Sequence, residues 1–132
     1  MLSLVPGDGG SQLQARLNKT WVPHYICAKS ADWYPLWLNL EQMIPTIIDC
    51  WVDNIRLVYD NQTHKTHNAP GVEVRVPGFG NTSTVEFLDE SKRSFSSYFA
   101  PIAKRLATMG YVRGVNMHGA PYDFRKAASA LI

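Results

Sequence analysis

Residues 4–13 read LVPGDGGSQL, a short apolar run that passes directly into three glycines around an aspartate. Leu2 to Val5 are typical of a short buried strand, which Pro6 and Gly7 would end. The glycine turn that follows has three interpretations. The turn could bind a phosphate, stabilise an oxyanion, or only reverse the direction of the chain.

The length and composition describe one globular domain. The chain has 132 residues, of which 45% are hydrophobic and 18% charged, and a second complete domain is not expected at this length. The formal net charge is only +2, and lysines and arginines are scattered in runs of no more than two. These features give no support to a nucleic-acid partner. No apolar run reaches the roughly 18 to 20 residues that span a bilayer.

Glycosylation sequons and cysteines favour the secretory pathway. Asn18, Asn61 and Asn81 each begin an N-x-S/T sequon, and three such sites in so short a chain predict a protein of the secretory pathway. An oxidising compartment favours a disulfide between Cys27 and Cys50. No signal peptide precedes the glycine turn, so we expect the chain to be part of a longer protein.

The pattern of apolar residues predicts an α/β architecture. Strands are expected at residues 2–5, 53–60, 71–80 and from 111 onward, and helices at 11–17 and 92–109. Pro101 should kink or shorten the second helix, and Gly110 should end it. The polar residues 61–70 predict a surface loop. Strands separated by helix and loop favour an α/β over an all-β fold.

Motifs for nucleotide, metal and covalent chemistry are missing from the sequence. Neither G-x-G-x-x-G nor G-x-x-x-x-G-K-[ST] occurs, so the phosphate interpretation of the turn loses support. Surface positions are favoured over a metal site for the histidines, and we expect no metal and no cofactor. The nucleophile elbow G-x-S-x-G is also absent from all 132 residues. Two interpretations of residues 6–10 remain: an oxyanion loop, or an ordinary turn after a strand.

Long segments of the chain match one protein family. In order, they are LVPGDGGSQLQARL, HYICAKS, WLNLEQMIPTIIDCWVDNIRLVYD, GVEVRVPGFGNTSTVEFLD and RGVNMHGAPYDFR. Together they resemble the lecithin:cholesterol acyltransferase family, and within it the lysosomal phospholipase A2 branch, from about residue 2 to residue 126. The resemblance implies that residues 1–132 form the N-terminal part of an α/β-hydrolase domain, without its Ser-Asp-His triad.

The same resemblance implies a function for the whole protein. Members of the family transfer an acyl chain from a glycerophospholipid to water or to a lipid alcohol, through a serine acyl-enzyme. The expected partners are therefore a phospholipid membrane or lipoprotein surface and the acyl acceptor. Without the triad, the chain alone is expected to be inactive. The alternative is a non-catalytic lipid-binding module or inactive fragment.

The resemblance also gives roles to individual residues. Residues 6–9 match the family's oxyanion loop, so the backbone N–H of Asp8 is the expected donor, and an acid there points to the phospholipase branch. Family members usually carry leucine where this chain has Gly9. Cys27 and Cys50 match a family disulfide that closes a lid or membrane-binding loop, here residues 27–50.

Aromatic residues of this loop are the expected lipid contacts. Trp37 matches the family's lid tryptophan, and Trp33 and Leu36 are expected to join it; the alternative is that all three pack internally. The stretch YDFR (122–125) matches the family's Y-D-W-R. We expect it to be a structural turn in which Asp123 and Arg125 organise neighbouring loops.

Overall fold

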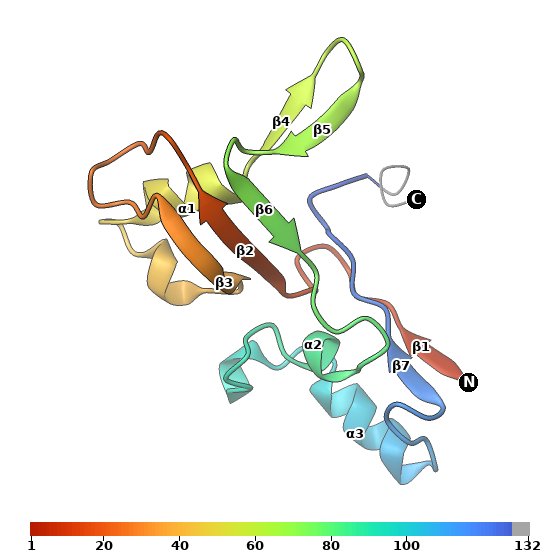
Figure 1. Ribbon diagram of the computed structural model, residues 1–132. Coiled ribbons are helices and arrows are strands. Elements are labelled where there is room, and N and C mark those ends of the chain that lie inside the picture. The colour runs from red at the N-terminus through yellow and green to blue at the C-terminus, as the bar shows by residue number, and fades with distance from the viewer. Residues whose placement is uncertain (128–132) are drawn as a thin grey trace.

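The structure is a computed structural model that describes residues 1–127, and it combines short strands with short helices (Figure 1). The main sheet has the antiparallel order β3–β2–β6, with strands β2 (Leu13–Asn18), β3 (Ser30–Trp37) and β6 (Val72–Arg75). Two further pairs are the parallel β1 (Leu2–Leu4) with β7 (Met117–Gly119), and the hairpin of β4 (Leu57–Asp60) with β5 (Lys65–Asn68).

Three helices and two 3₁₀ turns complete the described residues. They are α1 (Ile48–Ile55), α2 (Ser83–Glu86), α3 (Ala100–Thr108), η1 (Leu40–Met43) and η2 (Ser94–Ser96). The expectation of mixed helix and strand is confirmed. No helix within residues 1–127 has both the length and the apolar character needed to cross a membrane.

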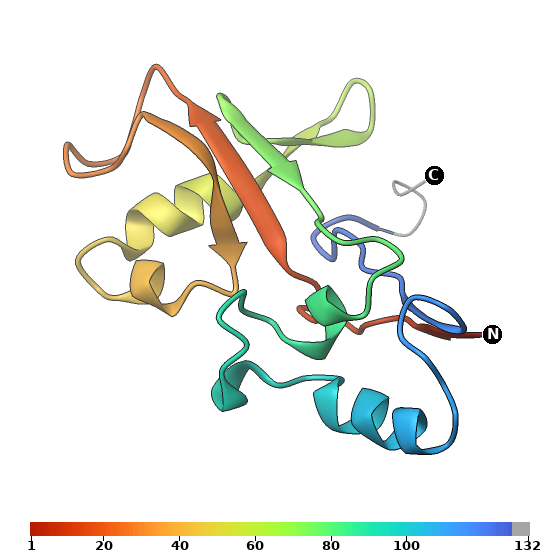
Figure 2. The same ribbon diagram turned by 60° about the horizontal axis from the view of Figure 1, so that its bottom comes forward.

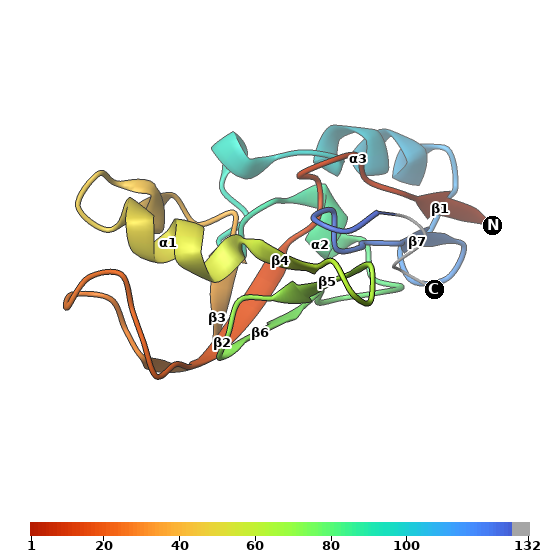
Figure 3. The same cartoon turned by 90° about the horizontal axis from the view of Figure 1, so that it is seen from above.

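The central strand β2 divides the main sheet into an inner and an outer face. Leu13, Ala15 and Leu17 are buried on the inner face, where Trp51 and Ile55 of α1 pack against them. Figure 3 shows α1 running along this side of the sheet. The burial of these apolar side chains is the main stabilisation of the first of two cores.

The prediction of a helix over residues 11–17 is wrong. Leu13 and Leu17 are four residues apart, and this spacing places two side chains on one face of a strand as well as on one face of a helix. The pairing of β2 with β3 on one side and with β6 on the other decides for the strand, because it satisfies the backbone groups of the segment from both sides.

The second core lies under the β1–β7 pair. It contains Leu4 from β1, Val85 from α2, Ala103 from α3 and Met117 from β7, all of them buried. In Figure 2 the β1–β7 pair and α3 lie together at one end of the molecule, away from the β3 edge of the main sheet. The chain passes from this core to the first one through residues 5–12.

Other predicted boundaries need correction. The helix expected at 92–109 begins only at Ala100, because Pro101 occupies its first turn, where a missing N–H costs nothing. Residues 53–60 are split between the end of α1 and β4, and residues 61–70 form the turn and second strand of a hairpin rather than a loop alone.

The strand expected from residue 111 begins at Met117. The strand predicted at 71–80 is present as β6 but covers only Val72–Arg75, and Gly78 and Gly80 follow it with positive φ.

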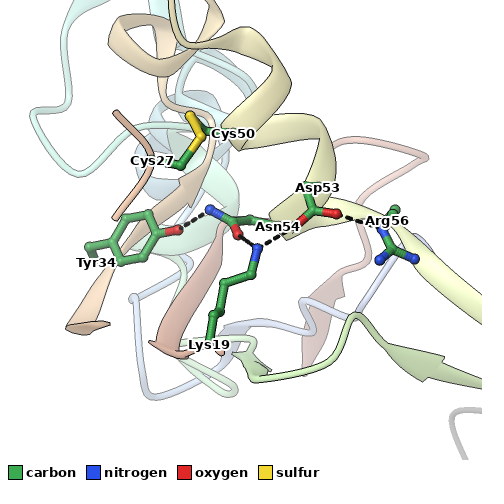
Figure 4. Close-up of polar contacts among 7 residues, drawn as sticks. All are labelled: Lys19, Cys27, Tyr34, Cys50, Asp53, Asn54 and Arg56. Atoms are coloured by element: carbon green, nitrogen blue, oxygen red, sulfur yellow. Dashed lines mark hydrogen bonds and ion pairs between the residues drawn. A yellow bond between two sulfur atoms is a disulfide. The ribbon is translucent and has the colours of Figure 1, made fainter. Parts of the chain in front are cut away.

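A buried ion pair between Lys19, which directly follows β2, and Asp53 of α1 connects these two elements (Figure 4). The Lys19 ammonium, whose side chain is 3% exposed, donates to the Asp53 carboxylate and to Asn54 Oδ1, the latter at 2.9 Å. Burial alone would raise the pKa of the Asp53 carboxyl. Hydrogen bonds from Lys19 and Arg56, together with their charges, outweigh burial and hold this pKa below its usual value. Asp53 therefore stays ionised under mildly acidic conditions, and the pair persists there.

We predict that Lys19→Met lowers the free energy of unfolding by about 3 kcal/mol, because it leaves the Asp53 carboxylate buried without its ammonium partner. Urea unfolding at neutral pH measures the change. The matched control is Lys104→Met on the exposed side of α3, which should change stability by less than about 0.5 kcal/mol. Equal effects of the two substitutions would contradict the importance of the pair.

Candidate active site

The segment between β1 and β2 reverses direction in a tight turn over residues 7–10. The Gly10 N–H donates to the Gly7 carbonyl oxygen at 3.0 Å, and Gly9 has a φ of 73°. A positive φ at the third position is the property of a type II turn, which glycine adopts without strain. Gly10 is required for a different reason. A Cβ atom at this position would lie 2.7 Å from Tyr98 Cε1 and 2.8 Å from Pro6 Cβ.

Two aromatic side chains from distant segments hydrogen-bond to this turn. The Gly7 N–H donates to the Tyr98 hydroxyl oxygen at 3.1 Å, and the Trp37 indole N–H donates to the Gly9 carbonyl oxygen at 2.8 Å. Trp37 is the last residue of β3, and Tyr98 lies just before α3. The sequence predicted no role for Tyr98. No local signal marks it, because Gly7 and Tyr98 are 91 residues apart.

Asp8 lies at the exposed tip of the turn. Its backbone N–H donates to no acceptor within residues 1–127, and the same is true of the Gly9 N–H. An unpaired N–H on an exposed residue of a fixed turn is a donor available to a ligand oxygen. This is the chemistry that the oxyanion interpretation of residues 6–10 requires.

The three expected lipid contacts occupy different environments. Trp37 is half-buried beside the turn, with its ring centroid 6.2 Å from that of Trp51 and 5.7 Å from that of Phe124. Leu36 is 0% exposed and belongs to the first core. The expectation that Leu36 contacts lipid is therefore corrected, because its side chain is fully buried in the same core as Leu13.

Trp33 lies on the outer face of the main sheet. The guanidinium carbons of Arg16 and Arg75 are 5.3 Å and 4.1 Å from its ring centroid, distances at which a cation is attracted to the ring. Arg16 in turn pairs with Glu73 at 2.7 Å. Charged side chains thus already cover part of the Trp33 ring.

The expected Cys27–Cys50 disulfide is present, with the two Cα atoms 5.5 Å apart (Figure 4). The segment that it closes is more than a loop, since it contains β3, η1 and the start of α1. Large apolar side chains in and beside this segment are exposed, and the sequence pattern did not separate them from the buried ones. They are Trp21, Tyr25, Ile26, Leu40 and Ile44.

The stretch 122–125 has the structural role that we predicted. The Arg125 guanidinium donates to both carboxylate oxygens of Asp123, at 2.9 and 2.7 Å, and both side chains are buried. It also donates to the Ile55 carbonyl oxygen at 3.0 Å and to Asn68 Oδ1 at 2.9 Å. Arg125 therefore joins the C-terminal segment to the ends of α1 and β5.

The remaining predicted sites lie at the surface. Asn18 at the end of β2, Asn61 in the β4–β5 turn and Asn81 before α2 are all exposed. Across residues 1–127 no group of three or more His, Cys, Asp or Glu side chains is placed to hold a metal ion.

Comparison with known proteins defines the class to which this fold and turn belong. The family model described as Lecithin:cholesterol acyltransferase matches residues 33–131. The chain is a member of the lecithin:cholesterol acyltransferase family, as the resemblance predicted.

Relatives from two groups of enzymes are similar to this chain. The lysosomal phospholipase A and acyltransferase of Bos taurus is 54% identical over 125 residues, which are 94% of this chain and 31% of the bovine protein. The Homo sapiens protein of the same name is 54% identical over the same length, 30% of its own. The phosphatidylcholine-sterol acyltransferase of Homo sapiens is 45% identical over 123 residues, 92% of this chain and 28% of that protein. The chain thus spans about three tenths of the length of these relatives.

We predict that replacing both Cys27 and Cys50 with serine lowers the free energy of unfolding by about 3 kcal/mol, since the bond closes a loop with a sequence separation of 23. Chemical denaturation measures the change. Adding dithiothreitol supplies the control: it should destabilise the unaltered chain and leave the double variant unchanged. A double variant as stable as the unaltered, oxidised chain would contradict the prediction.

Proposed function

We propose that this chain forms part of an α/β-hydrolase that acts as a phospholipase A and O-acyltransferase on glycerophospholipids. The names of the relatives support an acyl-transferring activity on lipids. The observation that carries the proposal within the chain is the unpaired N–H of Asp8 on a turn of fixed shape. The nucleophile elbow does not occur in residues 1–132, and the proposal takes the triad serine, aspartate and histidine from the part of the relatives' length that this chain does not match.

The proposed reaction uses the Asp8 N–H to stabilise an oxyanion. The serine oxygen attacks the ester carbonyl carbon of the phospholipid while histidine accepts the serine proton, and the carbonyl oxygen becomes negatively charged. The Asp8 N–H donates to this oxygen. Collapse of the intermediate breaks the ester bond and releases the lysophospholipid, which takes the proton from histidine. Water or a lipid alcohol then attacks the acyl-enzyme by the same steps in reverse order.

The lipid side of the proposal rests on the segment closed by the disulfide. Trp37 lies beside the turn through its bond to the Gly9 carbonyl, so an acyl chain that reaches the turn would pass its ring. The exposed apolar side chains around the disulfide would face the phospholipid membrane or lipoprotein surface. Trp33 contributes only if the outer face of the sheet also meets lipid. In this arrangement residues 27–50 act as the lid or membrane-binding segment.

The proposed location is the lysosome or the extracellular space. The disulfide suits an oxidising compartment. The exposure of Asn18, Asn61 and Asn81 supports all three as glycosylation sites, because a glycan needs solvent around the side-chain amide.

The Asp8→Pro substitution tests the proposed donor directly. Proline has no N–H, and it suits the second position of a type II turn, so the turn keeps its shape while the donor is lost. The test protein is a full-length chimera in which the matched 125 residues replace those of the bovine relative. We expect kcat for phospholipid hydrolysis to fall by about 10²–10³-fold.

Asp8→Ala is the matched control, because it removes the carboxylate and keeps the N–H. We expect it to retain most of the kcat of the unaltered chimera. Equal losses in both variants would transfer the role from the backbone to the carboxylate and contradict the proposal. Full activity of Asp8→Pro would contradict it as well.

A further inference from the structure

We infer that Tyr98 is a positioning residue for the oxyanion turn, acting on the donor of Asp8 through its neighbour Gly7. This inference rests on the function proposed above. The Tyr98 hydroxyl oxygen accepts the Gly7 N–H at 3.1 Å, the hydrogen bond nearest to Asp8 on the N-terminal side of the turn. The peptide group between Gly7 and Asp8 carries the Asp8 N–H, so fixing Gly7 fixes the direction of that donor.

The ring of Tyr98 also supports the turn by contact. A Cβ atom at Gly10 would lie 2.7 Å from Tyr98 Cε1, and one at Gly7 would lie 3.3 Å from the Tyr98 hydroxyl oxygen. The two glycines therefore leave the space that the tyrosine occupies. The Tyr98 side chain thus contacts both ends of the turn, at Gly7 and at Gly10. This contact explains why residues 7 and 10 lack side chains, although only Gly9 has a positive φ in the turn.

Tyr98 is itself held by the second core. Its backbone N–H donates to the Glu86 carbonyl oxygen at 2.8 Å, and the N–H of Phe99 donates to the Val85 carbonyl oxygen at 3.2 Å. The Tyr98 ring lies 4.5 Å, between centroids, from that of Phe99. The Glu86 carboxylate pairs with Arg113 at 2.6 Å. Tyr98 is thus positioned by α2 and by its neighbour Phe99, the N-cap residue of α3.

Trp37 holds the opposite side of the same turn. Its indole N–H donates to the Gly9 carbonyl oxygen, on the other side of Asp8 from the Gly7–Tyr98 bond. The side chains that make these two hydrogen bonds belong to different cores: Trp37 packs against the first core, and Tyr98 is hydrogen-bonded to the second. Asp8 is therefore fixed from both directions, and each core contributes one side chain.

The substitution that tests this inference is Tyr98→Phe, which keeps the ring and removes the hydroxyl. In the full-length chimera we expect kcat to fall by about tenfold, because a displaced donor stabilises the oxyanion less well. KM should not change, since the hydroxyl does not touch bound lipid in this account. In the 132-residue chain, amide hydrogen exchange of Gly7 should become about fivefold faster.

Tyr59→Phe is the matched control. It also removes one hydroxyl hydrogen bond, to His64 Nδ1 at 2.9 Å in the β4–β5 hairpin, and should leave kcat and the Gly7 exchange rate unchanged. Equal kcat values for Tyr98→Phe and Tyr59→Phe would overturn the inference, as would an unchanged exchange rate of Gly7. An unaltered chimera without activity counts instead against the proposed function. The Gly7 exchange rate then still decides whether Tyr98 holds the turn.

Discussion

The hydrogen bond from the Trp37 indole to the Gly9 carbonyl oxygen joins the two parts of the molecule on which the candidate site depends. On one side is the segment closed by the Cys27–Cys50 disulfide, which ends β3 at Trp37. On the other is the glycine turn that connects the two cores. Because one side chain belongs to both, the position of the disulfide-closed segment and that of the proposed donor are linked. A change in the conformation of the disulfide-closed segment would therefore alter the position of the turn.

The turn needs this support because glycine has few conformational restraints of its own. Residues 7–10 include three glycines and one exposed aspartate, and such a chain loses much backbone entropy when it is fixed. A proposed oxyanion donor must be held in place before the reaction, since reorganisation during the reaction would raise the barrier. The internal Gly10–Gly7 bond and the two aromatic side chains together restrict the turn. The two cores on either side therefore hold the turn in one conformation, which its glycine-rich sequence alone would not fix.

Local patterns in the sequence predicted part of this arrangement, and long-range contacts decided the rest. The strand before the turn and the strand at 72–75 follow from short apolar runs and alternation, and both are present. The disulfide was predicted from the sequons together with the family resemblance, and the role of Arg125 from the resemblance alone, because the spacing of these residues does not identify their partners. The helix expected at 11–17 was wrong, since Leu13 and Leu17 fit both periodicities and only the neighbouring strands distinguish them.

Burial was the property least accessible from the sequence. Leu36 and Leu40 stand in the same aromatic-rich stretch, yet one is fully buried and the other is exposed. Lys19 would be assigned to the surface from its type, but it lies in a buried ion pair with Asp53. Tyr98 lies 91 residues from Gly7, and nothing near either residue indicates their contact. Lys19 is buried through its contact with α1, and Tyr98 is held beside α2, so both positions depend on segments that are distant in the chain.

The proposed reaction depends above all on the Asp8 N–H, which binds the oxyanion. The most direct test is a crystal structure of the full-length chimera with a phosphonate bound covalently to its serine, since the phosphonyl oxygen takes the place of the oxyanion. We predict a distance of about 2.7–3.1 Å from the Asp8 nitrogen to that oxygen. An oxygen bound only by other donors, with the Asp8 nitrogen beyond hydrogen-bond distance, would contradict it.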